Sequence, residues 1–288
     1  KKSRNTVQKA VATKKKAKEA CDEMVAEIKT IGETIVQRET EQKQMKIDCD
    51  KKVGLIGNIV LDSVPISQDE DADNEVIRKW GDCKPSTATT LSHHDLLWRI
   101  GGYEPERGVA VAGHRAYFLK DVGVMLNQAL ISYASAFLRK RQYSLLQPPY
   151  FMNKEAMAGV AQLEQFDEEL YKVSGDGEDK YLIATSEQPI CAYHGGDWME
   201  EKNLPVRYGG VSTCFRKEAG KHGKDTWGIF RVHQFDKVEQ FCIVEGDLEQ
   251  SEKMHMEMLE ASEEFHKSLG LPYRVINIVS GALNNAAA

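Results

Sequence analysis

The sequence lacks several features that would assign it to a common functional class. Its 288 residues contain no apolar run long enough to cross a bilayer and no hydrophobic signal segment. They also contain no Gly-x-Gly-x-x-Gly fingerprint and no P-loop lysine motif, so neither a Rossmann nor a Walker nucleotide site is expected. With 41% hydrophobic and 28% charged residues, the composition is that of a soluble globular protein. We therefore expect no membrane partner.

Paired metal-binding cysteines are also missing. The six cysteines are scattered with no Cys-x-x-Cys spacing, at positions 21, 49, 83, 191, 214 and 242. This pattern argues against a zinc knuckle and favours reduced thiols in the cytoplasm. We expect no metal ligands among the residues of this chain.

Acidic residues are absent from the first 18 positions, which hold eight Lys and Arg residues. The rest of the chain has 30 basic and 44 acidic side chains, a net charge of -14. A basic block on an acidic protein is either a local binding surface for a polyanion or simply a solvated helix face.

Proline is absent from residues 17 to 60, and glycine is sparse there until Gly54. Residues spaced alternately by three and four form a coiled-coil seam, at positions 21, 24, 28, 31, 35, 38, 42, 45, 49, 52, 56 and 59. The polar residues Arg38 and Gln42 make the middle of this seam its weakest part. A helix of about 40 residues would be about 60 Å long and needs a partner helix.

Residues 1–16 are the expected partner, because Val7, Ala10 and Val11 have helical spacing. We predict an antiparallel helical arm over residues 1–62, incomplete at its N-terminal end. Its tip would carry Lys14, Lys15 and Lys16.

Residues 63–96 change character, with prolines, an acidic run and a Ser/Thr cluster, and are predicted to be a surface linker that includes His93 and His94. Residues 97–288 are predicted to be the core domain. An amphipathic helix is expected over 122–141, and further helices over 154–163 and 249–269. Strands are expected over 181–186, 206–217, 229–244 and 273–279. This alternation predicts an α+β domain built on an antiparallel sheet flanked by helices.

The segment from 211 to 241 reads VSTCFRKEAGKHGKDTWGIFRVHQFDKVEQF and is predicted to be a hairpin. If its strands pair, alternation puts Arg216 and Glu218 on one face of the first strand. The second strand then presents Arg231, His233, Phe235, Lys237 and Glu239 on one face. Such a face is either a solvated hairpin with ion pairs across the strands or a site for a small, highly charged ligand. Trp227, in the intervening loop, fits either a packing role or a substrate contact.

The same segment resembles motif 2 of the class II aminoacyl-tRNA synthetases, and RVHQFDKVEQF resembles the eukaryotic cytosolic seryl-tRNA synthetase family. QYSLLQPPYF resembles motif 1, with Pro149 as its proline and Gln142 where the motif usually has glycine. YLIATSEQP resembles the serine-binding loop of that family. The N-terminal arm resembles its tRNA-binding coiled coil. The resemblance covers nearly the whole chain and implies a class II synthetase core.

The resemblance implies a role for each matching residue. Arg216 would be the catalytic residue, bridging the α-phosphate of ATP and the carboxyl group of serine. Glu218 would accept from the adenine amino group, and Phe235 would stack on the ring. The ATP site would comprise Arg216, Lys217, Glu218, Val232, His233, Gln234 and Phe235. The serine site would comprise Thr185, Glu187, Arg216 and Glu239. Lys14, Lys15 and Lys16 would contact tRNA.

The resemblance also implies the reaction and the partners. Serine and ATP, with Mg²⁺ on the phosphates, would give seryl-adenylate and pyrophosphate, and the seryl group would then move to tRNA(Ser). A homodimer built through motif 1 is expected, and tRNA(Sec) is a further candidate substrate. The chain ends in NIVSGALNNAAA, where the family continues into motif 3, so we expect very weak or no adenylation by these 288 residues alone.

Two other functions remain open at this stage. The first is a non-catalytic, synthetase-like tRNA-binding or scaffold protein. The other is a class II ligase for threonine or proline, which the arm and the absence of a Cys/His zinc cluster disfavour.

Overall fold

The structure of the chain is a computed structural model that describes residues 2–84, 87, 90–161, 169–175, 177–218, 223 and 226–287. It divides into two compact units. One comprises Lys1–Ile77 with Ile276–Ala288, and the other comprises Arg78–Val275. Within the described part of the chain, every helix is too short or too polar to cross a bilayer.

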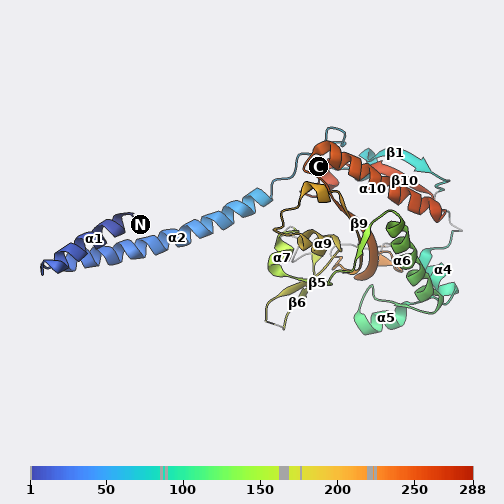
Figure 1. Cartoon of the computed structure of the whole chain (residues 1–288). Coiled ribbons are helices and arrows are strands. Elements are labelled where there is room, and N and C mark those ends of the chain that lie inside the picture. Colours follow the sequence, from blue (N-terminus) through green and yellow to red (C-terminus); the bar gives the residue numbers. More distant parts are fainter. Residues whose placement is uncertain are drawn as a thin grey trace. The chain divides into compact units, whose positions relative to one another are not determined.

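The first unit begins with a helical hairpin. Helix α1 spans Lys2–Lys16 and helix α2 spans Asp22–Gly54. The two helices pack against each other, with α1 lying along the N-terminal part of α2 (Figure 1). Val11 is buried, and Val7 and Ala10 are half-buried, as the spacing of these residues predicts. The 33-residue α2 is about 50 Å long.

The predicted seam of α2 is only partly covered. Its positions from Cys21 to Ile35 are all half-buried, whereas Met45 is 72% exposed. Because α2 ends at Gly54, Ile56 and Ile59 lie outside the helix, and the prediction that the helix extends to residue 59 was wrong. The C-terminal half of α2 therefore presents its apolar stripe without a partner helix among the described residues.

The rest of the first unit joins residues 58–74 to the C-terminal residues. Within the segment expected to be a linker lie α3 (Glu70–Asp73), β1 (Glu75–Trp80) and the start of α4 (His93–Arg99). Asn58 N–H donates to Asn285 O at 2.8 Å, and Val279 N–H donates to the side chain of Asn74 at 2.9 Å. Val279 is fully buried. These contacts fix the 3₁₀ turn η3 (Ser280–Ala282) against the chain that follows α2.

The second unit mixes short strands with helices. Its helices after α4 are α5 (Pro105–Ala112), α6 (Val122–Lys140), α7 (Lys154–Ala158), α9 (Glu187–Tyr193), the 3₁₀ helix η1 (Glu201–Asn203) and α10 (Leu248–Ser268). Its strands are β2 (Tyr103–Glu104), β3 (Phe118–Leu119), β4 (Ser144–Leu146), β5 (Phe151–Asn153), β6 (Lys172–Val173), β7 (Lys180–Leu182), β8 (Val206–Phe215) and β9 (Gln234–Ile243). Strand β10 (Tyr273–Asn277) pairs with β1, and the boundary between the units falls within both strands.

The principal sheet has the strand order β4, β8, β9. Strands β8 and β9 form a ten-residue antiparallel ladder in which Val206 faces Ile243 and Phe215 faces Gln234. Strand β4 joins the edge of β8 in parallel, with Ser144 opposite Tyr208. The prediction of a purely antiparallel sheet was therefore wrong at this edge. A long connection that includes β5, α7, β6, β7 and α9 separates β4 from β8, and such a crossover allows parallel pairing.

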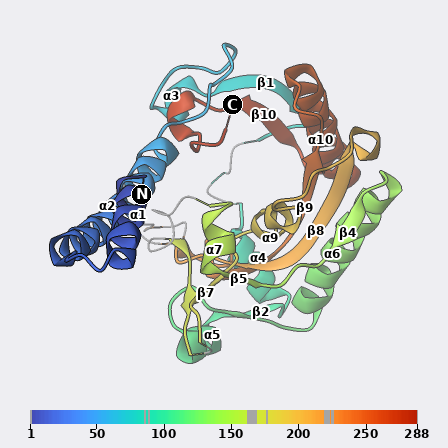
Figure 2. The same cartoon turned by 60° about the vertical axis from the view of Figure 1, so that its left-hand side comes forward.

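Different helices cover the two faces of this sheet. Helix α6 packs against β8 and β9 on one face, and Gln240 of β9 donates to Met258 O of α10 at 3.0 Å on the same face. Helix α9 contacts β9 on the other face. Figure 2 shows α6 and β4 on the outer side of the curved β8 and β9, with α9 on the inner side. The α9 face is the one on which the candidate site lies.

A second sheet, of order β5, β7, β6, supports the segment leading to this site. Its hydrophobic core consists of Met152, Met157, Leu170, Tyr181, Ile183 and Ala184. Ile183 is fully buried, and its carbonyl accepts from Phe215 N–H at 2.8 Å, at the end of β8. Residues 184–186 therefore leave a rigid core and arrive beside the β8–β9 hairpin.

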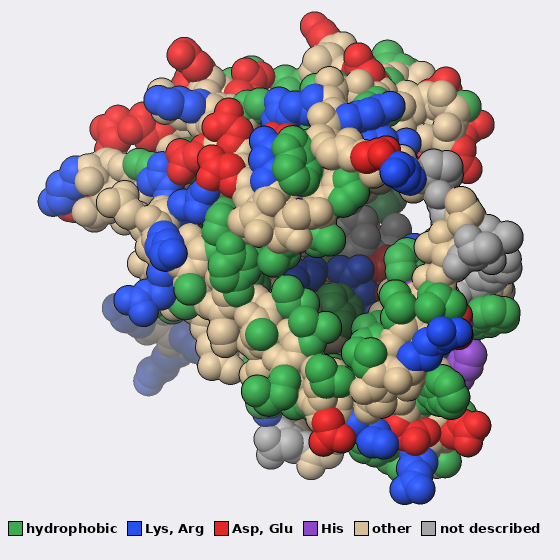
Figure 3. All heavy atoms as spheres, turned by 90° about the vertical axis from the view of Figure 1, so that its right-hand side faces the viewer, with side chains coloured by type: hydrophobic (Ala, Val, Ile, Leu, Met, Phe, Trp, Pro, Cys, Tyr) green, Lys and Arg blue, Asp and Glu red, His purple; other side chains and the backbone are tan. Residues whose placement is uncertain are grey.

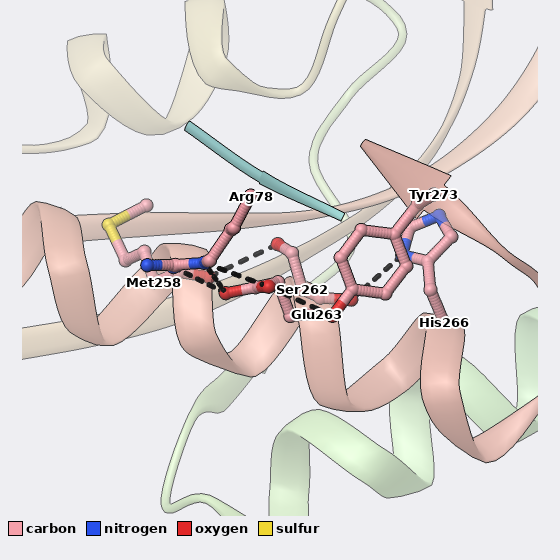
Figure 4. Close-up of polar contacts among 6 residues, drawn as sticks. All are labelled: Arg78, Met258, Ser262, Glu263, His266 and Tyr273. Atoms are coloured by element: carbon pink, nitrogen blue, oxygen red, sulfur yellow. Dashed lines mark hydrogen bonds and ion pairs between the residues drawn. The ribbon is translucent and has the colours of Figure 1, made fainter. Parts of the chain in front are cut away.

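An ion-pair cluster joins β1, α10 and β10 within the second unit. The Arg78 guanidinium donates to both carboxylate oxygens of Glu263, and the Tyr273 hydroxyl donates to Glu263 Oε1 at 2.8 Å (Figure 4). The Glu263 side chain is 10% exposed. The Arg78 hydrogen bonds hold the pKa of this carboxyl below its ordinary value, with a further contribution from Tyr273. The Glu263 carboxylate of α10 thus joins the neighbouring β10 to Arg78 of β1, which lies 185 residues earlier in the chain.

Replacing Glu263 with glutamine is expected to lower the midpoint of thermal unfolding by roughly 5 °C, because charge-assisted bonds to Arg78 would be lost. The folded-state pKa lies below the unfolded one, so this contribution is complete at neutral pH and is lost only as the pH falls below about 4. Scanning calorimetry at pH 7 would measure the change. The matched control is Glu252→Gln, at an exposed position of α10. Equal midpoints for the two variants would contradict the stabilising role.

Candidate functional site

The register of the hairpin gathers charged and aromatic residues on one face. Cys214 faces Phe235, Ser212 faces Lys237, and Gly210 faces Glu239. Arg216 and His233 follow in the same register, because Arg216 N–H donates to His233 O at 3.0 Å. The alternation in the sequence predicts this shared face for Arg216, Phe235 and Glu239.

Strand β9 begins at Gln234, five residues later than predicted. Arg231, Val232 and His233 therefore precede the strand, yet His233 is firmly held. Its Nδ1–H donates to Arg216 O at 2.9 Å, which makes its contact with Arg216 reciprocal. Val232 is buried at 4% exposure, so only its backbone could face a ligand.

Two cations lie close to the ring of Phe235. The guanidinium carbon of Arg216 is 5.4 Å from the ring centroid, and the ammonium nitrogen of Lys237 is 5.8 Å from it. Arg216 Nε also donates to Ala184 O at 3.4 Å. This arrangement combines a planar stacking surface with positive charge, which suits a nucleotide whose base stacks while its phosphates meet the arginine.

Glu239 is held by the turn that precedes α9. Its carboxylate accepts from Thr185 Oγ1 at 2.8 Å and from Ser186 N–H at 2.7 Å, and Ser186 Oγ also donates to it. Gly210, opposite Glu239 on β8, permits this approach, because a Cβ at that position would lie 2.1 Å from Ser186 Oγ. The structure thus brings together Thr185 and Glu239, as expected.

Glu218 lies between two arginines at the end of the same face. Its Oε2 is 3.5 Å from Arg231 Nη1 and 3.9 Å from Arg115 Nη1. The side chain of Glu218 is only 10% exposed. This carboxylate is therefore directed into the protein rather than into solvent.

Other predicted site residues have different surroundings. Gln234 is exposed, and its pairing with Phe215 puts it on the opposite face of the sheet. Glu187 is exposed at the start of α9. The described residues that donate hydrogen bonds to Glu239 are Thr185 and Ser186, and Glu187 is not one of them. Lys217 is anchored by its backbone, which donates to Glu169 O at 3.0 Å.

His93 and His94 contact the return of the hairpin loop, so the expectation of a bare linker surface was wrong. His93 Nε2 accepts from Ile229 N–H at 3.0 Å, and the His94 ring packs edge-on against Trp227 with centroids 6.0 Å apart. Trp227 is 56% exposed and makes this ring contact, and both roles considered for it stay predictions. Because Nε2 accepts, His93 is neutral in this arrangement. Burial, and then the neighbouring His94, lowers the pKa of His93.

We expect this contact to weaken in acid. Because the folded-state pKa of His93 is below the ordinary value near 6.5, its contribution to stability is complete above that pH and is lost as the pH falls through the folded-state value. Hydrogen exchange at the Ile229 amide, corrected for intrinsic rates, should lose about threefold protection between pH 7.5 and pH 5. His93→Gln, which keeps an acceptor but cannot titrate, should abolish this dependence, whereas His255→Gln, on an exposed part of α10, should leave it intact. A pH-independent amide in the wild type would contradict the expectation.

The described residues of the site do not form a cluster of metal ligands. Over the described ranges of the chain, no group of three or more His, Cys, Asp or Glu residues is arranged to hold a metal ion. The face instead offers cations, one aromatic ring and two fixed carboxylates. Chemically, this suits a ligand set with phosphates, a base and an ammonium group.

Comparisons with known proteins assign the fold and the family. Residues 171–288 match the tRNA synthetase class II core domain (G, H, P, S and T). The cytoplasmic serine–tRNA ligase of Dictyostelium discoideum is 58% identical over 280 residues, covering 97% of this chain and 61% of that protein. The seryl-tRNA synthetase from Pyrococcus horikoshii, solved in complex with ATP, matches with a TM-score of 0.81 at 35% identity, covering 98% of this chain and 67% of that one. The chain belongs to the seryl-tRNA synthetase family.

A second solved structure agrees with this assignment. The cytoplasmic serine–tRNA ligase from Naegleria fowleri, in complex with AMP, matches with a TM-score of 0.81 at 47% identity, covering 99% of this chain and 66% of that one. The class II synthetase core predicted from the motifs is thus confirmed. The chain spans about three fifths to two thirds of the length of the relatives it matches.

The family assignment explains one unusual backbone position. Gln142 stands where motif 1 usually has glycine, and its φ is 65°, in the left-handed region that glycine adopts without strain. A glycine at position 142 would adopt this conformation without strain, whereas Gln142 adopts it at a cost. The strand of this motif is β4, at the parallel edge of the principal sheet.

Several residues of the site were missed by sequence reasoning. Ser186 lies within the segment that resembles the serine-binding loop, next to Thr185. Its position in this segment was the signal that its hydroxyl could donate a hydrogen bond to Glu239. Arg115 and Tyr171 have no such signal, because each is brought to the hairpin only by the fold. The Tyr171 ring packs edge-on against His233, with centroids 6.0 Å apart.

Proposed function

We propose that this chain carries the ATP-binding and serine-binding face of an ATP-dependent serine–tRNA ligase. The observation that supports it best is the clustering of Arg216, Phe235, Glu239 and Thr185 on one face of the β8–β9 hairpin. Relatives named as cytoplasmic serine–tRNA ligases, with solved members in complex with ATP and AMP, support the same activity. No observation favours a non-catalytic scaffold or a threonine or proline ligase.

In the proposed ATP site, the adenine ring stacks on Phe235 and its amino group donates to Glu218. His233 and the backbone of Val232 would line the base, and Lys217 would lie toward the phosphates. Gln234 faces away, so a role for it would be limited to its backbone. Mg²⁺ would be bound chiefly by the ATP phosphates, because the described residues offer it no carboxylate cluster.

In the proposed serine site, Glu239 accepts from the substrate ammonium and hydroxyl groups. Thr185 and Ser186 hold the Glu239 carboxylate at 2.7 to 2.8 Å, and so determine where these groups can bind. A pocket that hydrogen-bonds a hydroxyl group rejects alanine strongly, since its buried polar groups would be left unpaired. Glu187, exposed at the start of α9, would act only at the rim.

The proposed reaction has two steps. A carboxylate oxygen of serine attacks the α-phosphorus of ATP, and pyrophosphate leaves with the electron pair of the broken P–O bond. Arg216 contacts both groups and stabilises the charge that develops on the α-phosphate. The terminal ribose hydroxyl of tRNA then attacks the seryl carbonyl, and AMP leaves. Positioning accounts for much of the rate enhancement.

The proposed tRNA contact is the basic end of the helical hairpin, which in this proposal is the coiled-coil arm of the family. Lys14, Lys15 and Lys16 form the last turn of α1 and are exposed. Changing all three to alanine is expected to raise the KM for tRNA(Ser) roughly tenfold and to reduce the salt dependence of binding, while adenylation stays unchanged. Equal loss of both activities would mean that the arm has a structural role. tRNA(Sec) would be tested as a second substrate in the same assay.

The homodimer expected through motif 1 is also part of the proposal, with α6, the helix that directly precedes this motif, as part of the interface. Exposed apolar side chains along this helix include Val122, Met125, Leu126, Leu130 and Tyr133. Figure 3 faces the side on which α4 and α6 lie in Figure 1 and shows hydrophobic side chains gathered there. Such a patch is typical of a protein interface. Leu126→Glu should shift the sedimentation coefficient from that of a dimer to that of a monomer.

Amino-acid-dependent ATP–pyrophosphate exchange on the full-length protein tests the proposed function. Serine should support exchange, and threonine, alanine and proline should each support less than about 1% of that rate. Exchange that does not depend on serine would refute the proposal. The names of the relatives and the six free thiols support a cytoplasmic location.

A further inference from the structure

Arg115 is a buried arginine that reaches the site from outside the motifs. It lies between α5 and β3, about one hundred residues before the hairpin, and its side chain is only 6% exposed. Its Nη1 is 3.9 Å from Glu218 Oε2, and Arg231 approaches the same oxygen at 3.5 Å from the other end of the loop. A charge buried this deeply is costly unless it interacts with an opposite charge. Glu218 supplies that charge.

The backbone at both partners is strained. Arg115 has a φ of 65° and Glu218 a φ of 50°, and both are in the left-handed region, which is unfavourable for a residue other than glycine. The segment is held tightly against α5, because a Cβ at Gly108 would lie 2.4 Å from Tyr117 Cα. Strain of this kind persists where the surrounding structure enforces it, and it clusters at functional sites. Here it occurs at both partners of one ion pair.

The charge of Arg115 also reaches the aromatic side of the site. The pKa of Tyr171 is raised by burial, and the positive charge of Arg115 opposes that rise. Tyr171 packs against His233, whose backbone and side chain both bond to Arg216. Arg115 thus pairs with Glu218 at one end of the hairpin loop, and its charge acts on Tyr171, which packs against His233 at the other end.

We propose that Arg115 is a positioning residue of the nucleotide site, acting by fixing the orientation of the Glu218 carboxylate. Both arginines pair with Oε2, at 3.9 Å from Arg115 and 3.5 Å from Arg231, and among the described residues no hydrogen bond reaches Oε1. Oε1 is thereby left to accept from the base. This role rests on the proposed function, because it takes the base to be the adenine of ATP.

A fixed acceptor at this position selects the base by chemistry. The 6-amino group of adenine donates a hydrogen bond to a carboxylate oxygen, whereas the 6-oxo group of guanine cannot donate and would be repelled. Without Arg115, the carboxylate would be held by Arg231 alone and could turn toward it. The preference for ATP over GTP would then fall.

Calorimetric titration of the full-length protein with ATP and with GTP tests the role without requiring adenylation. We expect Arg115→Met to weaken ATP binding roughly tenfold and to leave GTP binding unchanged. In serine-dependent exchange, the KM for ATP should rise by the same factor while the KM for serine changes less than twofold. Arg115→Lys, which keeps the charge but loses the planar guanidinium, should have an intermediate effect.

A double-mutant cycle separates this role from a merely structural one. If Arg115 acts through Glu218, Arg115→Met should add less than a twofold loss of ATP affinity in a Glu218→Gln background. The matched control is Arg107→Met, at an exposed position of α5, with thermal unfolding measured for every variant. Additive losses, or equal losses of ATP and GTP binding, would overturn the role. A wild type that binds ATP but shows no serine-dependent exchange would instead refute only the proposed function.

Discussion

Arg216→Ala is expected to reduce serine-dependent ATP–pyrophosphate exchange by a factor of about 100 to 1000. The guanidinium lies beside Phe235 and next to Ala184 O, so it stands between the proposed base and serine sites. Removing a preorganised donor from a developing negative charge costs about 3 to 4 kcal/mol in other enzymes. The loss should fall mainly on kcat, because the charge is greatest in the transition state. Arg216→Lys, which keeps the charge without the planar guanidinium, should recover part of the rate.

The control for this change is Arg274→Ala, at an exposed arginine of β10. Both variants should unfold within a few degrees of the wild type. If both Arg216→Ala and Arg274→Ala kept an exchange rate within threefold of the wild-type rate, the result would show that Arg216 has no catalytic role.

Glu239→Gln is expected to raise the KM for serine roughly 30-fold to 100-fold, or about 2 to 3 kcal/mol, and to change the KM for ATP less than twofold. Glutamine has the same shape and can still accept from Thr185 or Ser186 through its one oxygen. It lacks the negative charge that would face the ammonium group of serine. The substitution therefore tests the charge of Glu239 rather than its volume.

Steady-state exchange with serine and ATP varied separately measures both constants. Glu245→Gln, at an exposed position after β9, is the matched control. A proportional rise in both constants would indicate general damage to the hairpin. An unchanged KM for serine would place the ammonium group elsewhere.

The shared face of the hairpin could be predicted from sequence because it depends on local geometry. A period of two fixes the sides of Arg216 and Glu239 once the strands are antiparallel. Periodicity also predicted α6. An amphipathic helix was expected over residues 122–141, and the observed helix spans Val122–Lys140. Periodicity identifies such elements because each buries one of its faces.

The contacts of Arg115 and His93 could not be predicted in this way. Each joins segments more than one hundred residues apart, Arg115 to Glu218 and His93 to Ile229. The residue pattern of one segment does not indicate which distant segment it will contact. These contacts follow from how α4 and α5 pack within the second unit. For the same reason the sequence could not reveal that β4 joins β8 in parallel. Strand direction at an edge is decided by the whole connection rather than by the strand itself.

Gly210 shows how a substrate pocket can restrict sequence variation at a residue that never touches the substrate. A methyl group there would lie 2.1 Å from Ser186 Oγ and 2.9 Å from the Ile190 side chain. Even alanine would displace the turn that carries Thr185. Among natural variants of the family, change at this position should therefore be rarer than change at the exposed Gln234, although Gln234 directly precedes Phe235, the residue proposed to stack on the base.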